Sequence, residues 1–348
     1  MHGEYKVAGG KLVVAGLAVA DGVIHDVVLS GDFFLEPDEA LGHMSDALEG
    51  LPADASLGRL VQAVDEARGD AVMVGFDPQG VAHAVLRALG RSTAWHDHSF
   101  ELLEAGPQHP PMQMAIDEVV ARQVGDGVRG PTLRVWEWAS NAVIIGSFQS
   151  LSNEVDVEAA ARHGATVVRR ISGGGAMFVE PGNTITYSLY VPATLVEGLS
   201  YADSYAFLDA WVIRALRELG VEATYVPLND IASPLGKIGG AAQKRLASGV
   251  VLHHVTMSYD MDASKMLDIL RIGREKLSDK GHVSAAKRVD PIRSQTGMSR
   301  EAVVEAMLGH FEASYGLTTV TIDDKTLEEA AALAETKFED PEWTARVP

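Results

Sequence analysis

The chain has 348 residues, no cysteine, and 48 acidic against 29 basic residues, which gives a net charge of −19 at pH 7. Its length predicts two domains with ample core, its charge opposes nonspecific binding to nucleic acid, and the lack of cysteine excludes disulfides and thiolate nucleophiles. No apolar run is long enough to span a bilayer, and the start Met1-His2-Gly3-Glu4 lacks the features of a signal peptide. We therefore expect a cytoplasmic protein with neither a nucleic-acid nor a membrane partner.

The first 90 residues alternate strand and helix patterns. Residues 11–19 and 23–30 alternate well enough to be strands, joined by a tight turn at Ala20-Asp21-Gly22. Helices are expected from about residue 38 to 49, after a cap at Ser56, and from Asp77-Pro78 to Leu89. Residues 91–97 show no periodicity, so we predict a domain over 1–90, a linker over 91–97 and a second domain over 98–348.

The second domain is predicted to be of mixed α+β class. Helical spacing is found at 111–124, 203–219, 299–314 and 324–337. Strands are expected near 132–138, 142–147, 165–169, 176–180, 184–191 and 249–258, and a long loop covers about 271–297.

A run of three glycines lies between two of these strands. Residues 169–175 read Arg-Arg-Ile-Ser-Gly-Gly-Gly. Glycine lets the backbone approach a ligand closely and use its N–H groups as donors, while arginine supplies charge for a phosphate or carboxylate. The pattern indicates an anion-binding loop, and a flexible turn is the alternative.

Several motifs occur in an order that resembles a known family. They are Trp136-Glu137-Trp138, the arginine–glycine loop, Gly182-Asn183, Asn229-Asp230, Lys237 in its glycine-rich setting, and His253-His254-Val255-Thr256. From about residue 100 to the end the chain resembles the lipoate-protein ligases, within the superfamily that includes lipoyl and octanoyl transferases and biotin-protein ligases. Residues 3 to about 90 resemble the small accessory domain of these ligases, which commonly follows the catalytic domain, so the arrangement resembles a circular permutation.

This resemblance implies an α+β fold of the biotin/lipoate ligase type and an ATP-dependent reaction. Lipoate and Mg-ATP would form lipoyl-AMP, and the lipoyl group would pass to a lysine of lipoyl domains in 2-oxoacid dehydrogenase E2 subunits and in the glycine cleavage H protein. Some relatives carry the acyl group on a cysteine, which this chain lacks. The missing cysteine therefore favours the ligase branch, in which ATP activates the acid.

The resemblance also assigns roles to individual residues. Lys237 is the expected catalytic residue, since an ammonium there would attract both carboxylate and α-phosphate. The residues expected to bind lipoate are Arg170, Ser172, Gly173, Gly174, Gly175, Trp138 and His254. Those expected to bind ATP or the adenylate are Gly175, Met177, Phe178, Asn183, Asp230, Lys237, Thr256, Lys280 and Ser284, with Asp230 the expected magnesium contact.

Two departures from the family pattern leave the preferred acyl chain open. A histidine common after the aromatic residue is replaced in Phe178-Val179-Glu180, and the usual His-Gly-Thr is His254-Val255-Thr256. Adjacent strand residues point to opposite faces, so we do not expect His253 and His254 to share a metal. The alternatives are an ATP-independent octanoyl or lipoyl transferase, a catalytically silent lipoyl-binding protein, and a biotin-protein ligase, which the lack of a Gly-Arg-Gly-Arg loop disfavours.

Overall fold

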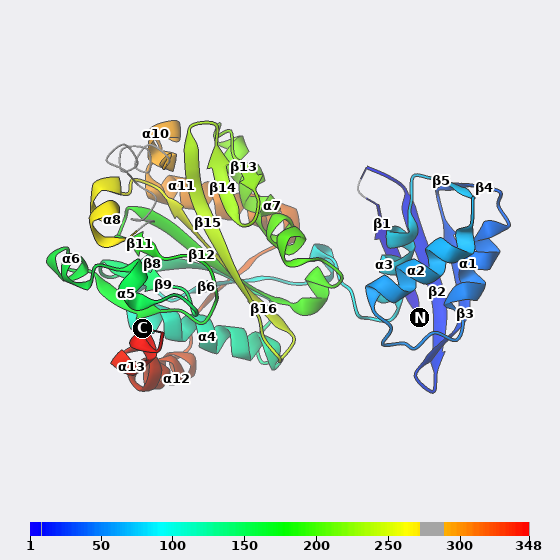
Figure 1. Cartoon of the computed structure of the whole chain (residues 1–348), viewed down its shortest axis with the longest axis horizontal. Coiled ribbons are helices and arrows are strands. Elements are labelled where there is room, and N and C mark those ends of the chain that lie inside the picture. Colours follow the sequence, from blue (N-terminus) through cyan, green and yellow to red (C-terminus); the bar gives the residue numbers. More distant parts are fainter. Residues whose placement is uncertain (8, 272–288, 348) are drawn as a thin grey trace. The chain divides into compact units, whose positions relative to one another are not determined.

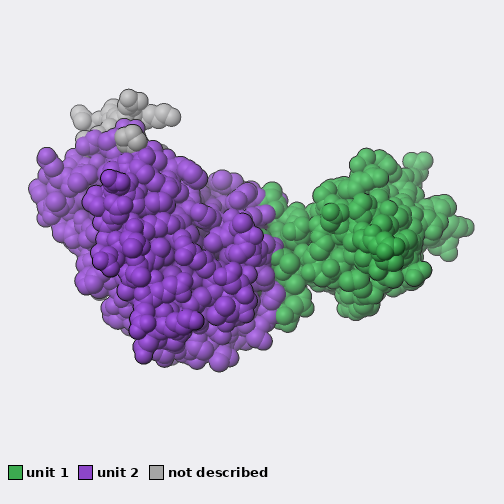
Figure 2. Space-filling model, turned by 90° about the horizontal axis from the view of Figure 1, so that it is seen from below, with its two compact units in different colours: residues 1–97, 194–200 green, residues 98–193, 201–348 purple. Residues whose placement is uncertain are grey.

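The computed structural model describes residues 1–7, 9–271 and 289–347. It divides into two compact units, coloured separately in Figure 2. Unit 1 comprises residues 1–97 and 194–200, and unit 2 comprises residues 98–193 and 201–348. No helix among the described residues is both long and apolar enough to cross a membrane.

Unit 1 is a three-stranded antiparallel sheet packed against three helices (Figure 1). Its strands lie in the order β1 (His2–Lys6), β2 (Leu12–Ala20), β3 (Val23–Gly31). The helices are α1 (Ala40–Leu48), α2 (Leu57–Arg68) and α3 (Pro78–Ala88), and β4 (Phe34–Glu36) pairs with β5 (Val72–Val74). The side chains of Ser56 and Asp77 accept hydrogen bonds at the starts of α2 and α3, as N-caps do. This unit therefore has its own core.

Residues 91–97 include a short helical turn, Trp95–Asp97, in which Trp95 is buried. The backbone N–H of Thr93 donates to the carbonyl of Thr194 at 2.9 Å, within unit 1.

Within the described residues, the main sheet of unit 2 has nine strands. Their order is β13 (Thr224–Val226), β14 (Asp230–Ser233), β15 (Gly236–Arg245), β16 (Val250–Ser258), β12 (Thr184–Pro192), β8 (Thr132–Trp138), β6 (Glu101–Glu104) and β17 (Thr318–Thr321), and β7 (Pro107–Gln108) pairs with β8 off this path. The central strands β12 and β16 are almost wholly buried, and their buried residues include polar side chains such as Ser188, His253 and His254.

Helices cover both faces of this sheet. On one face lies α4 (Pro110–Gly125), which also packs against α12 (Asp324–Leu333) and the π-helical turn Ala334–Phe338 that follows it. On the other face lie α7 (Tyr201–Glu218) and α11 (Arg300–Tyr315), where Trp211 of α7 stacks edge-on with Tyr187 of β12. The remaining helical segments that the structure describes are α5 (Leu151–Glu154), α6 (Val157–Arg162), Ala193–Val196, α8 (Ala263–Ile269), α10 (Ile292–Thr296) and α13 (Pro341–Ala345).

A second, three-stranded sheet carries the glycine-rich loop. Its central strand is β9 (Ala142–Ile145), with β10 (Thr166–Arg169) parallel on one side and β11 (Met177–Val179) antiparallel on the other. Because β10 and β11 flank β9, the intervening residues 170–176 must pass across the end of β9.

The predicted α+β class is confirmed. The structure also contains strands that the sequence analysis did not predict, namely β1, β4 to β7, β13 to β15 and β17. Most are short or rich in glycine, so they lack the alternation on which strand prediction depends.

Candidate active site

A cavity of about 370 Å³ opens between the glycine-rich loop and the main sheet. Its wall is mostly apolar, with Met114, Trp136 and Ile144 among the contributors. Seven of the predicted site residues line it, and these are Arg170, Gly175, Met177, Phe178, Lys237, His254 and Thr256. None of the wall residues that the structure describes is an aspartate or a glutamate. An apolar volume with cationic groups on its wall suits a molecule with an aliphatic part and a negative end.

The glycine-rich loop offers backbone donors beside this cavity. Among the described residues, the N–H groups of Gly173, Gly174 and Gly175 donate to no protein acceptor. Gly174 has φ +92°, which strongly favours glycine. A Cβ at Gly146, just after β9, would lie 2.1 Å from the carbonyl oxygen of Gly174. Glycine at 146 is therefore what lets the loop pack directly on the end of β9.

The two arginines of the loop have different surroundings. Arg169 is fully buried, and its guanidinium donates to the carbonyls of Gly146, Gln149 and Thr344, so it ties together backbone segments. Arg170 lines the cavity and donates to the carbonyls of Gly173 and Gly175 and to the Ser172 hydroxyl. Burial lowers the pKa of Arg170 to about 10, which leaves it charged at neutral pH.

A β-bulge places Lys237 on the cavity face of the sheet. In β15, Gly240 and Ala242 pair with Thr256 and His254 of β16. Since side chains alternate along a strand, Lys237 would face the other side of a regular β15. The register with β14 shifts between Ile231, opposite Gly239, and Ala232, opposite Lys237, so the strand gains one residue there. The extra residue returns Lys237 to the cavity side.

Lys237 is half-exposed and forms an ion pair with Asp230, with Nζ and Oδ1 2.7 Å apart. A Cβ at Gly240 would lie 3.1 Å from that Nζ and 3.4 Å from that Oδ1, so the glycine leaves room for the pair. Asp230 itself is not part of the cavity wall. The described residues contain no cluster of three or more metal-binding side chains. A magnesium contact at Asp230 stays a prediction, and the nucleotide's phosphates would have to supply most of its ligands.

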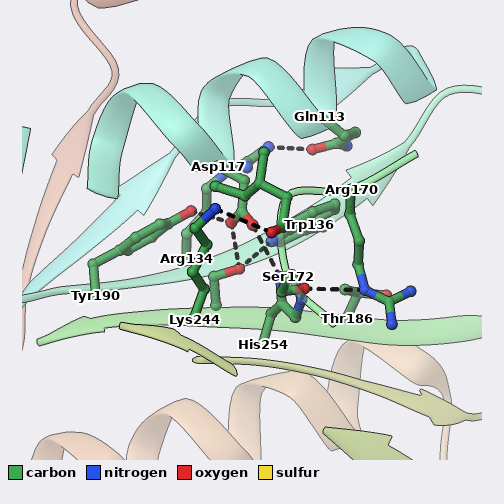
Figure 3. A network of polar contacts seen from close by, with 12 residues as sticks. Gln113, Asp117, Arg134, Trp136, Arg170, Ser172, Thr186, Tyr190, Lys244 and His254 are labelled. Carbon is green, nitrogen blue, oxygen red and sulfur yellow. Dashed lines mark hydrogen bonds and ion pairs between the residues drawn. The ribbon is translucent and has the colours of Figure 1, made fainter. Parts of the chain in front are cut away.

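A chain of buried polar groups runs from the cavity wall into helix α4 (Figure 3). His254 Nε2 lies 2.6 Å from the Ser172 hydroxyl, and its Nδ1 lies 2.9 Å from Asp117 Oδ2. The other carboxylate oxygen of Asp117 accepts from the hydroxyls of Ser188 and Tyr190, each at 2.6 Å. All five side chains are buried.

These contacts determine where the protons lie. Burial alone would raise the pKa of Asp117, but the hydrogen bonds from His254, Ser188 and Tyr190 lower it overall, so Asp117 is a carboxylate. Burial lowers the pKa of His254 and outweighs the opposing effect of Asp117, so the imidazole is neutral. A neutral ring that donates from Nδ1 to Asp117 has an acceptor at Nε2, to which the Ser172 hydroxyl donates.

The neighbouring His253 faces the opposite side of the sheet. Its Nε2 lies 2.6 Å from Asp209 of α7, and both side chains are fully buried. Strand β16 thus carries two adjacent histidines, each paired with an aspartate from the helix on its own side. Thr256 lies on the face of His254, as its two-residue spacing predicts.

The remaining predicted site residues lie off the cavity wall. Trp138 is buried behind Trp136, with ring centres 5.2 Å apart, and its Nε1 donates to Thr186. The Asn183 side chain donates to Glu180 and its carbonyl accepts from Tyr259. Ser172, Gly173 and Gly174 belong to the same loop as the wall residues Arg170 and Gly175 but are not wall residues themselves. Lys280 and Ser284, predicted to lie in an adenylate-binding loop, fall outside the described residues.

Sequence reasoning missed Asp117, which lies in a helix predicted over residues 111–124. The signal was present, because α4 is buried on all its faces and Gln113 and Asp117 are four residues apart on one of them. Polar side chains on a buried face of a helix must meet partners in the interior. Ser188 and Tyr190 lie two residues apart on β12 and so face Asp117 together.

Comparison with known proteins identifies the family of unit 2. Residues 109–312 match the model of the lipoyl protein ligase A/B catalytic domain. An octanoyltransferase LipM of an Exiguobacterium species is 29% identical over 277 residues, which are 72% of this chain and 98% of that protein. A probable lipoate-protein ligase A of Mycoplasma pneumoniae is 26% identical over 235 residues, 67% of this chain and 68% of that protein.

A solved structure of a bi-partite lipoate protein ligase from Thermoplasma acidophilum superposes with a TM-score of 0.63 at 27% identity. It covers 72% of this chain and 98% of that one. The predicted lipoate ligase fold is confirmed by this match. Since the family model also matches more than half of the chain, this protein belongs to the lipoyl protein ligase A/B catalytic domain family.

Proposed function

We propose that the protein is an ATP-dependent lipoate-protein ligase that makes lipoyl-AMP and transfers the lipoyl group to a lysine of lipoyl domains. The observation that carries this proposal is an apolar cavity with the cations Arg170 and Lys237 on its wall, in a chain without cysteine. Without a thiol this chain cannot hold the acyl group as its own thioester, and adenylation is a way to activate a free acid that needs no such intermediate.

In this proposal each part of the site binds a different part of the substrates. The dithiolane and chain of lipoate occupy the apolar part of the cavity, where each buried methylene contributes about 0.8 kcal/mol. The N–H groups of Gly173 to Gly175 and the guanidinium of Arg170 bind the negative end. A carboxylate oxygen attacks the α-phosphorus of ATP, the bond to pyrophosphate breaks, and Lys237 stabilises the charge that develops between them.

Asp230 holds Lys237 before substrates bind, since the ammonium lies 2.7 Å from its carboxylate. If Mg²⁺ accompanies ATP, it neutralises phosphate charge, and Asp230 is the carboxylate placed to contact it. The remaining site residues of this proposal are Ser172, Met177, Phe178, Asn183, Trp138, Thr256, Lys280 and Ser284.

Unit 1 is proposed to be the accessory domain of the ligase. The Thermoplasma ligase is bi-partite, and its matched chain aligns over 98% of its own length with 72% of this chain. In this chain both parts would be fused, with the accessory part first.

The second candidate is an ATP-independent octanoyltransferase, favoured by the names of several relatives. The test is release of pyrophosphate from ATP with lipoate, octanoate or biotin as the acid, followed by transfer to a lipoyl domain of an E2 subunit or H protein. We expect pyrophosphate release with lipoate and no lipoylation without ATP. Transfer from an octanoyl carrier protein in the absence of ATP would instead establish the transferase.

A further inference from the structure

Transfer of the acyl group to the acceptor lysine requires that the lysine lose protons, and a group on the cavity wall must accept one. The acceptor lysine has a reference pKa near 10.4, so only about one in two thousand is uncharged at pH 7. The amine must lose a proton before it attacks and a second one as the amide forms. A group on the cavity wall that can take a proton would contribute directly to this step.

His254 is the wall residue suited to that task. Arg170 is a guanidinium, the ammonium of Lys237 is paired with Asp230, and no described wall residue is a carboxylate. The ring of His254 is neutral, and its Nε2 is an acceptor that meets the Ser172 hydroxyl at 2.6 Å. The Asp117 carboxylate lies 2.9 Å from Nδ1 of His254. In the same arrangement in other enzymes, an aspartate orients a histidine that acts as a base and stabilises its charged form.

The surroundings of Asp117 support this assignment. Its carboxylate accepts hydrogen bonds from His254, Ser188 and Tyr190, and it is almost completely buried. A negative charge held beside Nδ1 stabilises the imidazolium at the moment Nε2 takes a proton. The other charged or titratable groups around His254 are Arg170 from the glycine-rich loop and His253 from its own strand.

We propose that His254, oriented by Asp117, accepts the proton of the acceptor amine at Nε2 during acyl transfer. The inference rests on the proposed function. The amine nitrogen bonds to the acyl carbon, the bond from that carbon to the AMP oxygen breaks, and AMP leaves with the electron pair. Of the two protons lost by the ammonium, the first goes to His254 Nε2 before attack and the second goes to solvent as the amide forms, and His254 then releases its proton to solvent.

The chain supplies a matched control for a buried histidine. His253 is adjacent, also buried, and paired with Asp209 at 2.6 Å, but it faces away from the cavity. His254→Gln and His253→Gln therefore each remove a buried histidine–aspartate contact from the same strand. Only the first should alter proton transfer.

The experiment supplies lipoyl-AMP directly to excess enzyme and compares two nucleophiles. One is the lysine of a lipoyl domain, and the other is hydroxylamine, which is uncharged at neutral pH and has less need of a base. We expect His254→Gln to slow transfer to lysine by about 10² to 10³-fold. The reduction in the rate of transfer to hydroxylamine should be at least tenfold smaller than the reduction with lysine. His253→Gln should slow transfer to both nucleophiles equally, or to neither.

If His254→Gln reduces the rates with lysine and with hydroxylamine by factors that differ less than tenfold, the proposal is overturned. A misplaced acyl group would slow both reactions alike. Asp117→Asn retains the ring and is judged by the same ratio if His254→Gln does not fold. If the wild-type protein does not transfer from lipoyl-AMP to a lipoyl domain at all, the proposed function fails instead. The two failures are therefore distinguishable.

Discussion

Lys237 combines two properties that rarely occur together in a surface lysine. It lines an apolar cavity, yet half of its side chain remains exposed, and its ammonium is held by Asp230 in a position that a glycine keeps open. A lysine whose charge is already oriented needs no reorganisation when a phosphate arrives. This arrangement fits a residue that stabilises a transition state.

Lys237→Ala should therefore slow formation of lipoyl-AMP by about 10² to 10³-fold, equivalent to roughly 3–4 kcal/mol of transition-state stabilisation. Its thermal unfolding should be unchanged, since the side chain is half-exposed. Pyrophosphate release measures the first property and circular dichroism the second. Lys325→Ala, at an exposed position on α12, is the control for loss of one positive charge. A Lys237→Ala protein that adenylates lipoate at the wild-type rate would refute the assigned role.

At the scale of elements, the glycine-rich loop depends on a contact between two backbones. The carbonyl of Gly174 occupies the space where a side chain at Gly146 would begin. Gly146→Ala should push the loop away from β9 and lower both the melting temperature and the affinity for lipoate. The expected cost is about 1–3 kcal/mol, typical of overpacking in a tight site.

The control for that substitution is Gly309→Ala in α11, where a Cβ would meet no atom within 4 Å. Alanine favours the helix over glycine by up to about 1 kcal/mol, so this variant should be as stable as the wild type or more so. Thermal unfolding and lipoate titration report on both variants. Equal behaviour of the two alanine variants would show that the loop does not need the close approach.

The loop could be read from the sequence because three glycines and two flanking strands have local signatures. Strand β15 could not be predicted from the sequence, because its glycines and alanines do not alternate with polar residues and its bulge depends on pairing with β14. The position of Lys237 on the cavity face follows from that bulge, so the sequence indicated the residue but not its geometry. Asp117 was missed because its role depends on Ser188, Tyr190 and His254, which are more than seventy residues distant.

At the scale of the whole molecule, each unit has its own hydrophobic core. Buried residues between Val13 and Ala88 form the core of unit 1, and a separate cluster surrounds α4 in unit 2. Residues 194–200 group with unit 1, and Thr93 bonds Thr194 there. The chain therefore passes between the units three times, at residues 97–98, 193–194 and 200–201.

We expect a fragment of residues 98–348 to transfer lipoate from supplied lipoyl-AMP but to make little lipoyl-AMP from ATP. Adding residues 1–97 as a separate chain should restore part of the first reaction, since segment 194–200 remains in the larger fragment and provides a contact for rebinding. Assays of both half-reactions on each fragment, alone and mixed, test this. Full adenylation by the larger fragment alone would show that unit 1 is dispensable.

The cavity wall carries cations, whereas the protein as a whole carries a net charge of −19. An anionic substrate is therefore repelled at long range and attracted only once it reaches the wall. Salt screens charges separated by more than about 8–10 Å at physiological ionic strength, so it weakens the repulsion first. The association rate constant of ATP, measured by stopped flow, should accordingly rise or stay constant between low and moderate salt, opposite to the usual slowing of electrostatically steered ligands. An enzyme of this kind would capture anionic substrates at moderate ionic strength no more slowly than at low ionic strength.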